Sequence, residues 1–124
     1  MKKIEIKVER TDTGYCGYAI KYPVYTVGGN FIELRAMMIE ALNQYFENET
    51  LTEADLKITL DLPQFFEFYK VINAKALGER IGMSQSLLAQ YITGKKKPSV
   101  AQTKRILAGI QQVGKELAEM QFLL

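Results

Sequence analysis

The spacing of apolar residues changes once along the chain, and this change constrains the fold more than any other feature of the sequence. Before Pro63, apolar and polar residues largely alternate with a period of two, as in Ile4, Ile6 and Val8, which is typical of half-buried strands. From Gln64 onward the apolar residues recur at 3.6-residue spacing, which is typical of helices. We therefore expect an α+β chain with two domains, residues 1–62 and residues 63–124.

The first half is expected to follow the order β-β-β-α-β, an antiparallel-rich sheet with one helix on a face. The alternating segments predict strands over residues 4–9, 15–22, 24–27 and 56–62. Asn30, followed three residues later by Glu33, is typical of a helix start. The face of this helix that should cover the sheet carries Leu34, Met38, Ala41, Leu42 and Tyr45.

The second half contains two short helices joined by a tight turn. After an aromatic first helix around residues 65–72, Asn73 can cap a helix that ends near Ile81, and a further helix runs from about Ser84 to Ile92. Gly78 is small enough to let the two helices approach closely, and Gly82 can adopt the backbone angles of the turn. This arrangement is the supersecondary unit that presents a helix to the DNA major groove.

A basic loop and a last helix complete the chain. Lys95, Lys96 and Lys97 form the loop, and Ser99 with Gln102 predicts the start of a helix that continues nearly to the end. Gly109 and Gly114 weaken this helix, so the sequence leaves open whether it is one bent helix or two.

The charges are distributed unevenly between the halves, although the net charge of the chain is only +2. Residues 1–62 carry seven Lys or Arg and ten Asp or Glu, whereas residues 63–124 carry nine and four. The basic half is therefore the candidate for nucleic-acid binding. On its second short helix, Gln85, Ser86 and Gln90 are expected to face outward, and a Gln side chain can form two hydrogen bonds with an adenine edge.

The segment from Gly82 to Lys95, GMSQSLLAQYITGK, resembles the Xre-like, phage-repressor family of helix-turn-helix domains. The resemblance implies three base-reading residues, Gln85, Ser86 and Gln90. It implies phosphate contacts from Ser84, Thr93 and Lys95, and the adjoining Lys96 and Lys97 extend this set. Where the family often has a phosphate-binding Gln at the start of its second helix, this chain has Ala74.

The amino-terminal half is similar to the HicB family of antitoxins. The similarity lies in residues 17–23 (GYAIKYP), 26–34 (TVGGNFIEL) and 41–47 (ALNQYFE). It implies a partial ribonuclease-H-like domain that neutralises a small mRNA-cleaving toxin, HicA, while the carboxy-terminal domain represses the operon. The chain departs from the family after Pro23, where only Val24 and Tyr25 replace a longer stretch.

Several functional classes are not expected from the composition. The chain has no His, which excludes His-based catalysis and His metal ligands, and the single Cys16 cannot form an internal disulfide and is expected to be a structural thiol. Its carboxylates fall on alternating positions and turns rather than on one site, so we expect no enzyme, no metal and no cofactor. No apolar run approaches the roughly 20 residues of a membrane span, and a cytoplasmic location is expected.

The expected partners are operator DNA in duplex form and a HicA-type toxin, with the chain acting as a homodimer or higher oligomer through residues 110–124. Two alternatives remain open. The chain could be a stand-alone transcription regulator whose first domain senses a ligand or docks another protein. It could also be an interaction module whose helix-turn-helix does not bind DNA.

Overall fold

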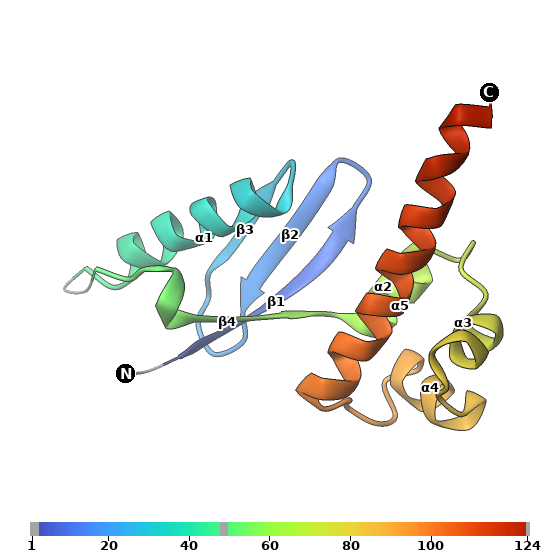
Figure 1. Ribbon diagram of the computed structural model, residues 1–124. Helices are drawn as coiled ribbons and strands as arrows, with labels where there is room; N and C mark the ends of the chain where they lie inside the picture. The colour runs from blue at the N-terminus through green and yellow to red at the C-terminus, as the bar shows by residue number, and fades with distance from the viewer. Residues whose placement is uncertain (1–2, 48–49, 124) are drawn as a thin grey trace. The chain divides into compact units, whose positions relative to one another are not determined.

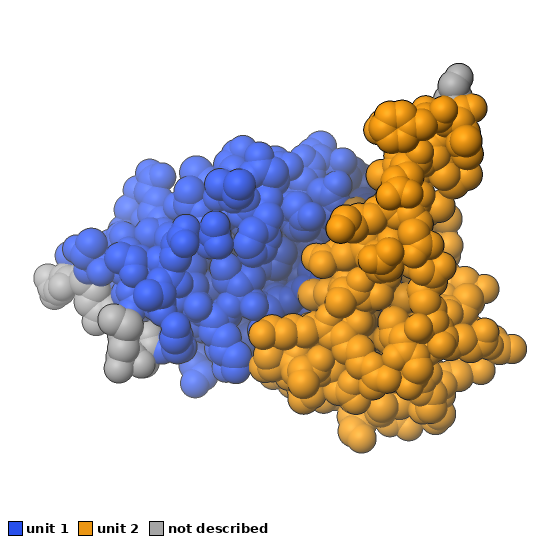
Figure 2. Space-filling model, in the orientation of Figure 1, with its two compact units in different colours: residues 1–68 blue, residues 69–124 orange. Residues whose placement is uncertain are grey.

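The computed structural model describes residues 3–47 and 50–123 and has an α+β architecture (Figure 1). The described residues form one four-stranded mixed sheet and five α-helices. The chain divides into two compact units, residues 1–68 and residues 69–124 (Figure 2). This division falls after Phe68, six residues later than the change of apolar spacing at Leu62. Leu124, the last residue of the expected oligomer contact, lies outside the described residues.

The sheet of unit 1 has the strand order β3-β2-β1-β4. Its strands are β1 (Ile4–Thr11), β2 (Gly14–Ala19), β3 (Tyr25–Gly28) and β4 (Leu56–Leu60). β2 is antiparallel to both β1 and β3, whereas β4 runs parallel to β1. β2 ends three residues earlier than the expected Tyr22, because the N–H of Ala19 donates to the carbonyl of Val24 (2.9 Å) and turns the chain.

Helix α1 (Phe31–Tyr45) packs on one face of this sheet. Asn30 caps it as predicted, since its Oδ1 accepts a hydrogen bond from the N–H of Glu33 at 2.8 Å. Of the expected stripe, Ala41 is half-buried and Tyr45 is exposed. The core between α1 and the sheet contains Leu34, Met38 and Leu42 from the helix and Ile4, Ile6, Val8, Ala19 and Leu56 from the strands. Unit 1 therefore has a continuous core beneath its single long helix.

Helix α2 (Leu62–Phe68) belongs to unit 1, although the sequence predicted a helix over residues 65–72 in the second domain. The Gln64 amide explains the difference, because it pairs with both backbone groups of Arg10 on β1. Its Nε2 donates to the Arg10 carbonyl (2.7 Å), and the Arg10 N–H donates to its Oε1 (2.9 Å). Phe66 is buried on the same helix. The side-chain amide of Gln64 thus pairs with the backbone of β1, and these two hydrogen bonds hold α2 to the sheet.

Unit 2 consists of α3 (Ala74–Ile81), α4 (Gln85–Ile92) and α5 (Val100–Ala118), followed by the short 3₁₀ segment η2 (Glu119–Leu123). The expected helix starts are confirmed, because a side-chain oxygen accepts a backbone hydrogen bond at each one. The capping residues are Asn73, Ser84 and Ser99. The buried residues of the unit include Leu77, Met83, Leu88, Tyr91 and Ile106.

Two glycines let these helices pack closely. A Cβ on Gly78 would lie 3.0 Å from the Met83 carbonyl oxygen in the turn and 3.4 Å from the Cδ2 of Leu88 on α4, as expected for a close approach of the two helices. A Cβ on Gly109 would overlap the Cγ2 of Ile81, so a larger residue there would force the Ile81 side chain to shift for α5 to lie against α3. α5 is one continuous helix, which answers the question left open by the sequence. Within residues 3–47 and 50–123, no helix is long and apolar enough to cross a membrane.

Candidate nucleic-acid interface

The outward side of α4 brings together the three residues expected to read bases. Gln85 and Ser86 are exposed and Gln90 is half-buried, while Leu88 and Tyr91 on the other side of the helix are buried. Ser86 and Gln90 are four positions apart and are neighbours on the helix surface, whereas Gln85 lies at the edge of the same side.

Ala89 also lies on this side and was missed by the sequence analysis. It is exposed, and it stands four residues after Gln85 and three after Ser86. The helical spacing alone could have identified it. Because the Ala89 side chain is a single methyl group, the backbone of α4 can come close to a flat or convex surface at this position.

The side chains on the outward side of α4 are uncharged, and the polar ones form directional hydrogen bonds. Each Gln amide offers an acceptor oxygen and two N–H donors, which is the pattern that matches the adenine edge in the major groove. Ser86 can donate or accept, and a methyl group such as that of Ala89 can contact a thymine methyl. No side chain on this side carries a full charge, so the set is suited to hydrogen bonding with base edges.

Ser84 stands at the amino-terminal end of α4 with its hydroxyl proton available. Its Oγ accepts a hydrogen bond from the N–H of Leu87 at 3.2 Å, and this bond does not use the hydroxyl proton. The residue is exposed and lies at the positive end of the helix dipole. A phosphate oxygen placed there would meet a donor and a favourable potential.

Thr93 at the other end of α4 uses its hydroxyl proton within the helix. Its Oγ1 lies 2.9 Å from the carbonyl oxygen of Ala89, to which it donates. A phosphate would have to compete with this bond. The two hydroxyls that the sequence predicted as phosphate contacts are therefore not equivalent, and Ser84 is the better donor.

The basic loop follows directly after α4. Gly94 has a φ of 79°, a left-handed conformation that favours glycine, and the N–H of Lys96 donates to the Gln90 carbonyl at 3.1 Å. Lys95, Lys96 and Lys97 are all exposed, and in the part of the chain that the structure describes none of them forms an ion pair. The loop thus places three ammonium groups beside one end of the helix.

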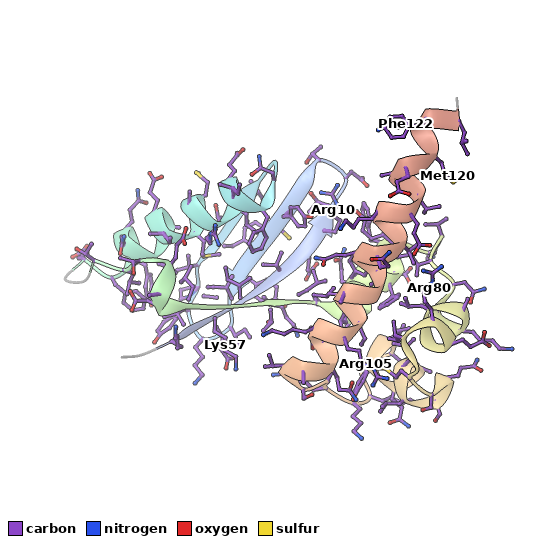
Figure 3. All side chains as sticks on the ribbon, in the orientation of Figure 1. Arg10, Lys57, Arg80, Arg105, Met120 and Phe122 are labelled. Atoms are coloured by element: carbon purple, nitrogen blue, oxygen red, sulfur yellow. The ribbon has the colours of Figure 1, made fainter. Side chains whose placement is uncertain are left out.

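Arg105 of α5 holds the turn between α3 and α4. Its Nε and Nη2 donate to the Ile81 carbonyl at 3.1 and 2.7 Å, and Nη2 also donates to the Gly82 carbonyl at 2.8 Å (Figure 3). Gly82 itself adopts the left-handed conformation, with φ 71°. The guanidinium fork therefore fixes the turn and with it the orientation of α4 on the unit. This role could not be predicted from the sequence, because the bonded carbonyl groups are 23 and 24 residues away.

A shallow groove of about 190 Å³ runs between α3 and α4. Its lining is mostly apolar, with polar side chains from both helices at its edge. The lining residues are Ala74, Lys75, Gln85, Leu88, Ala89, Ile92 and Thr93.

Searches against known proteins found no matching family model, no matching curated protein and no matching solved structure. The interpretation of the site therefore depends on the residues of this chain and on their placement.

Proposed function

We propose that unit 2 is a helix-turn-helix domain that binds duplex DNA and reads its sequence with α4. One observation carries the proposal: the uncharged side of α4 with Gln85, Ser86 and Gln90 lies between a capping hydroxyl at Ser84 and the exposed lysines 95–97. Hydrogen-bonding side chains in the middle with phosphate donors at both ends match what a helix in the major groove requires.

The parts of this site take different roles in the proposal. Gln85, Ser86 and Gln90 bond the base edges, and Ala89 lets the helix approach them. Ser84 and the lysines 95–97 neutralise or bond phosphates and set the register of α4 on the duplex, with a weaker contribution from Thr93.

For unit 1 the proposal is an antitoxin domain of the HicB type, with a partial ribonuclease-H-like fold. The β-β-β-α-β order and the covering of one sheet face by α1 support it, together with the three similar sequence segments. Residues 1–68 carry eleven Asp or Glu and seven Lys or Arg, a balance suited to a small basic partner such as a HicA-type mRNA-cleaving toxin. The whole chain would then be a cytoplasmic antitoxin without enzymatic activity that represses its own operon.

One observation favours the alternative of a stand-alone regulator. β3 is an edge strand of the sheet, and Tyr25 on it is 63% exposed next to the shortened segment after Pro23. An exposed edge of this kind can dock a different protein through strand addition.

Fluorescence anisotropy tests the DNA-reading proposal. We expect the chain to prefer duplex DNA from upstream of its own gene over a scrambled duplex. The Gln90→Ala variant should lose roughly 1 to 3 kcal/mol of binding free energy on the preferred duplex and little on the scrambled one. Gln111→Ala, an exposed Gln on α5, is the matched control. An equal loss on both duplexes would contradict base reading by Gln90.

The salt dependence of the same measurement tests the phosphate contacts. Each neutralised phosphate contributes a slope of about 0.9 in the logarithm of affinity against the logarithm of salt concentration. Lys96→Ala should therefore lower the slope by about 1 without changing the sequence preference. A slope near zero for the unmodified chain would argue against DNA binding altogether.

The antitoxin part is tested with the product of the neighbouring gene, which the proposal expects to be a small protein. If the proposal holds, that protein cleaves mRNA, and adding the full chain stops the cleavage and yields a stable complex in size-exclusion chromatography. A neighbour that is no nuclease, combined with sequence-specific DNA binding by this chain, would favour the stand-alone regulator.

A further inference from the structure

The groove between α3 and α4 adjoins the outward side of α4. Gln85 and Ala89 lie on that side and also line the groove, together with Thr93 at the end of the helix. Leu88 and Ile92 add apolar side chains to the lining. A base pair that meets this part of α4 would therefore contact an apolar surface as well as a hydrogen-bonding amide.

Thr93 contributes a methyl group to this surface. Its Oγ1 lies 2.9 Å from the Ala89 carbonyl oxygen, to which it donates, and 3.4 Å from the Gln90 carbonyl oxygen. The hydroxyl proton is thus used within the helix, although Thr93 is exposed and lines the groove. The remaining part of the side chain is the Cγ2 methyl group, which can contact a ligand without breaking these bonds.

Ala89 continues this apolar surface along α4. It stands four residues before Thr93 and four residues after Gln85, so the three side chains follow one another along the helix. Ala89 is exposed, whereas Leu88 beside it is buried. The accessible methyl groups of Ala89 and Thr93 therefore adjoin an apolar floor.

A small apolar surface of this kind matches one group in the major groove of DNA. Thymine presents its C5 methyl group there, whereas the nitrogen, oxygen and amino groups of the base edges call for hydrogen-bonding partners. Cytosine carries the same methyl group when it is methylated at C5. Removing one such group from water stabilises a complex by an amount that corresponds to about fourfold in affinity.

We propose that the groove between α3 and α4 recognises the C5 methyl group of a pyrimidine in duplex DNA, and that Ala89 and Thr93 contact this methyl group. The proposal rests on the DNA-reading function and specifies one base that α4 reads by apolar contact. Gln85, which lines the same groove, can donate to O4 of thymine or accept from the amino group of 5-methylcytosine. Ala89 and Thr93 are then specificity-determining residues.

A phosphate group fits the groove less well than a methyl group. Phosphate would lose its water shell against Leu88, Ala89 and Ile92, and desolvation of a charged group is costly unless it is fully paired. Lys75 also lines the groove, and its ammonium group can reach the aqueous edge while its apolar stem covers the lining. Lys75 is therefore suited to the phosphate beside the base whose methyl group enters the groove.

Replacement of thymine by uracil tests the proposal, because uracil differs from thymine only by lacking the C5 methyl group. In the upstream duplex that the chain is expected to prefer, each thymine is replaced in turn by deoxyuridine, and the affinity is measured by fluorescence anisotropy. We expect a loss of about fourfold at the thymine that meets the groove. Equal affinity for thymine and uracil at every position would overturn the proposal.

The same duplex distinguishes the two bases that carry the methyl group. At the sensitive position, a cytosine and a 5-methylcytosine, each paired with guanine, are compared with each other. Tighter binding of 5-methylcytosine by a similar factor would extend the recognition to methylated DNA, and equal binding would assign it to thymine.

Two substitutions of Thr93 separate the methyl contact from a hydroxyl contact. Thr93→Ser keeps the hydroxyl and removes the methyl group, so the ratio of the affinities for the thymine and uracil duplexes should fall from about four to below about two. Thr93→Val keeps a methyl group and removes the hydroxyl, so the ratio should be retained. Thr103→Ser on α5 is the matched control, because the Thr103 hydroxyl also donates to the carbonyl four residues earlier, at 2.9 Å.

Ala89→Gly should lower the same ratio. Ala108→Gly, at an exposed position of α5, is its control for the lower helix propensity of Gly. A ratio that stays at about four in both Thr93→Ser and Ala89→Gly would overturn the proposal, since the methyl group would then be recognised elsewhere.

These results separate the methyl site from the DNA-reading function. A chain that prefers the upstream duplex over the scrambled one but does not distinguish thymine from uracil would retain the DNA-reading function and overturn the methyl site. A chain without preference between the two duplexes would overturn both.

Discussion

Helices α1 and α5 are both long and both carry an apolar stripe, yet only α1 is covered along its stripe. Leu34, Met38 and Leu42 of α1 are all buried beneath the sheet, at the beginning, middle and later part of the helix. In α5 only Ile106 is buried, and the later part of the apolar stripe, from Leu117 on, is exposed. The difference shows that α1 completes the core of its own unit, whereas α5 has more apolar surface than its unit can cover.

The largest expected effect on stability comes from truncating a buried residue of the α1 stripe. Leu42→Ala should lower the free energy of unfolding by about 2 to 5 kcal/mol, because it leaves a cavity in the core between α1 and the sheet. Leu117→Ala should change it by less than about 0.5 kcal/mol, because the Leu117 side chain is 61% exposed. Urea denaturation followed by circular dichroism measures both. Similar losses in the two variants would erase the distinction between the helices.

A smaller effect is expected from adding a methyl group at two closely packed glycines, one in each unit. A Cβ on Gly28 of β3 would overlap the backbone of Leu34, which cannot move away, so Gly28→Ala should cost about 2 to 3 kcal/mol of stability. A Cβ on Gly109 of α5 would overlap a methyl group of Ile81, which can rotate, so Gly109→Ala should cost nearer 1 kcal/mol. Denaturation of the two variants side by side checks the order, and the reverse order would mean that α3 and α5 are held more rigidly than α1 and the sheet.

The smallest expected effect concerns an exposed ion pair that fastens α3 to the later part of α5. The Arg80 guanidinium donates to Glu116 at 2.8 Å and, with a further bond from Gln112, lowers the pKa of the Glu116 carboxyl. A lowered pKa means that the stabilisation is present above the pH at which the unfolded carboxyl titrates and is lost as the pH falls through the folded value.

We therefore expect Glu116→Gln to reduce the thermal midpoint slightly at pH 7, and we expect this difference to shrink as the pH falls through the lowered pKa of the folded state. Because both side chains are largely exposed, the change should be small. A difference that persists at low pH would show that the pair acts through packing rather than charge.

Local sequence signals predicted the starts of α1, α3, α4 and α5. Asn30, Asn73, Ser84 and Ser99 each bond a backbone N–H three residues later, so the interaction is contained in four consecutive residues. The exposed side of α4 could also be predicted from local sequence, because helical spacing alone decides which residues are neighbours on a helix surface.

Interactions between distant residues could not be predicted in this way. The placement of α2 depends on hydrogen bonds between Gln64 and the backbone of Arg10, 54 residues earlier. No residue near Gln64 in the sequence predicts that contact. The same holds for Arg105, whose carbonyl acceptors lie on another helix. For the candidate site, Gln85 and Ser86 could be placed on the exposed side from the sequence, whereas Arg105, which holds the turn before α4, could not be identified.

The parallel pairing of β1 with β4 has a consequence for how the chain folds. The first strand finds this partner only after about fifty residues have been added, because Ile4 pairs with Leu56 and Val8 with Leu60. By contrast, α3 and α4 meet within twenty residues. Since closing a long loop costs entropy before its contacts form, we expect unit 2 to fold faster than unit 1. On a ribosome, the antiparallel hairpin of β1 and β2 would wait with one edge unpaired until β4 had emerged.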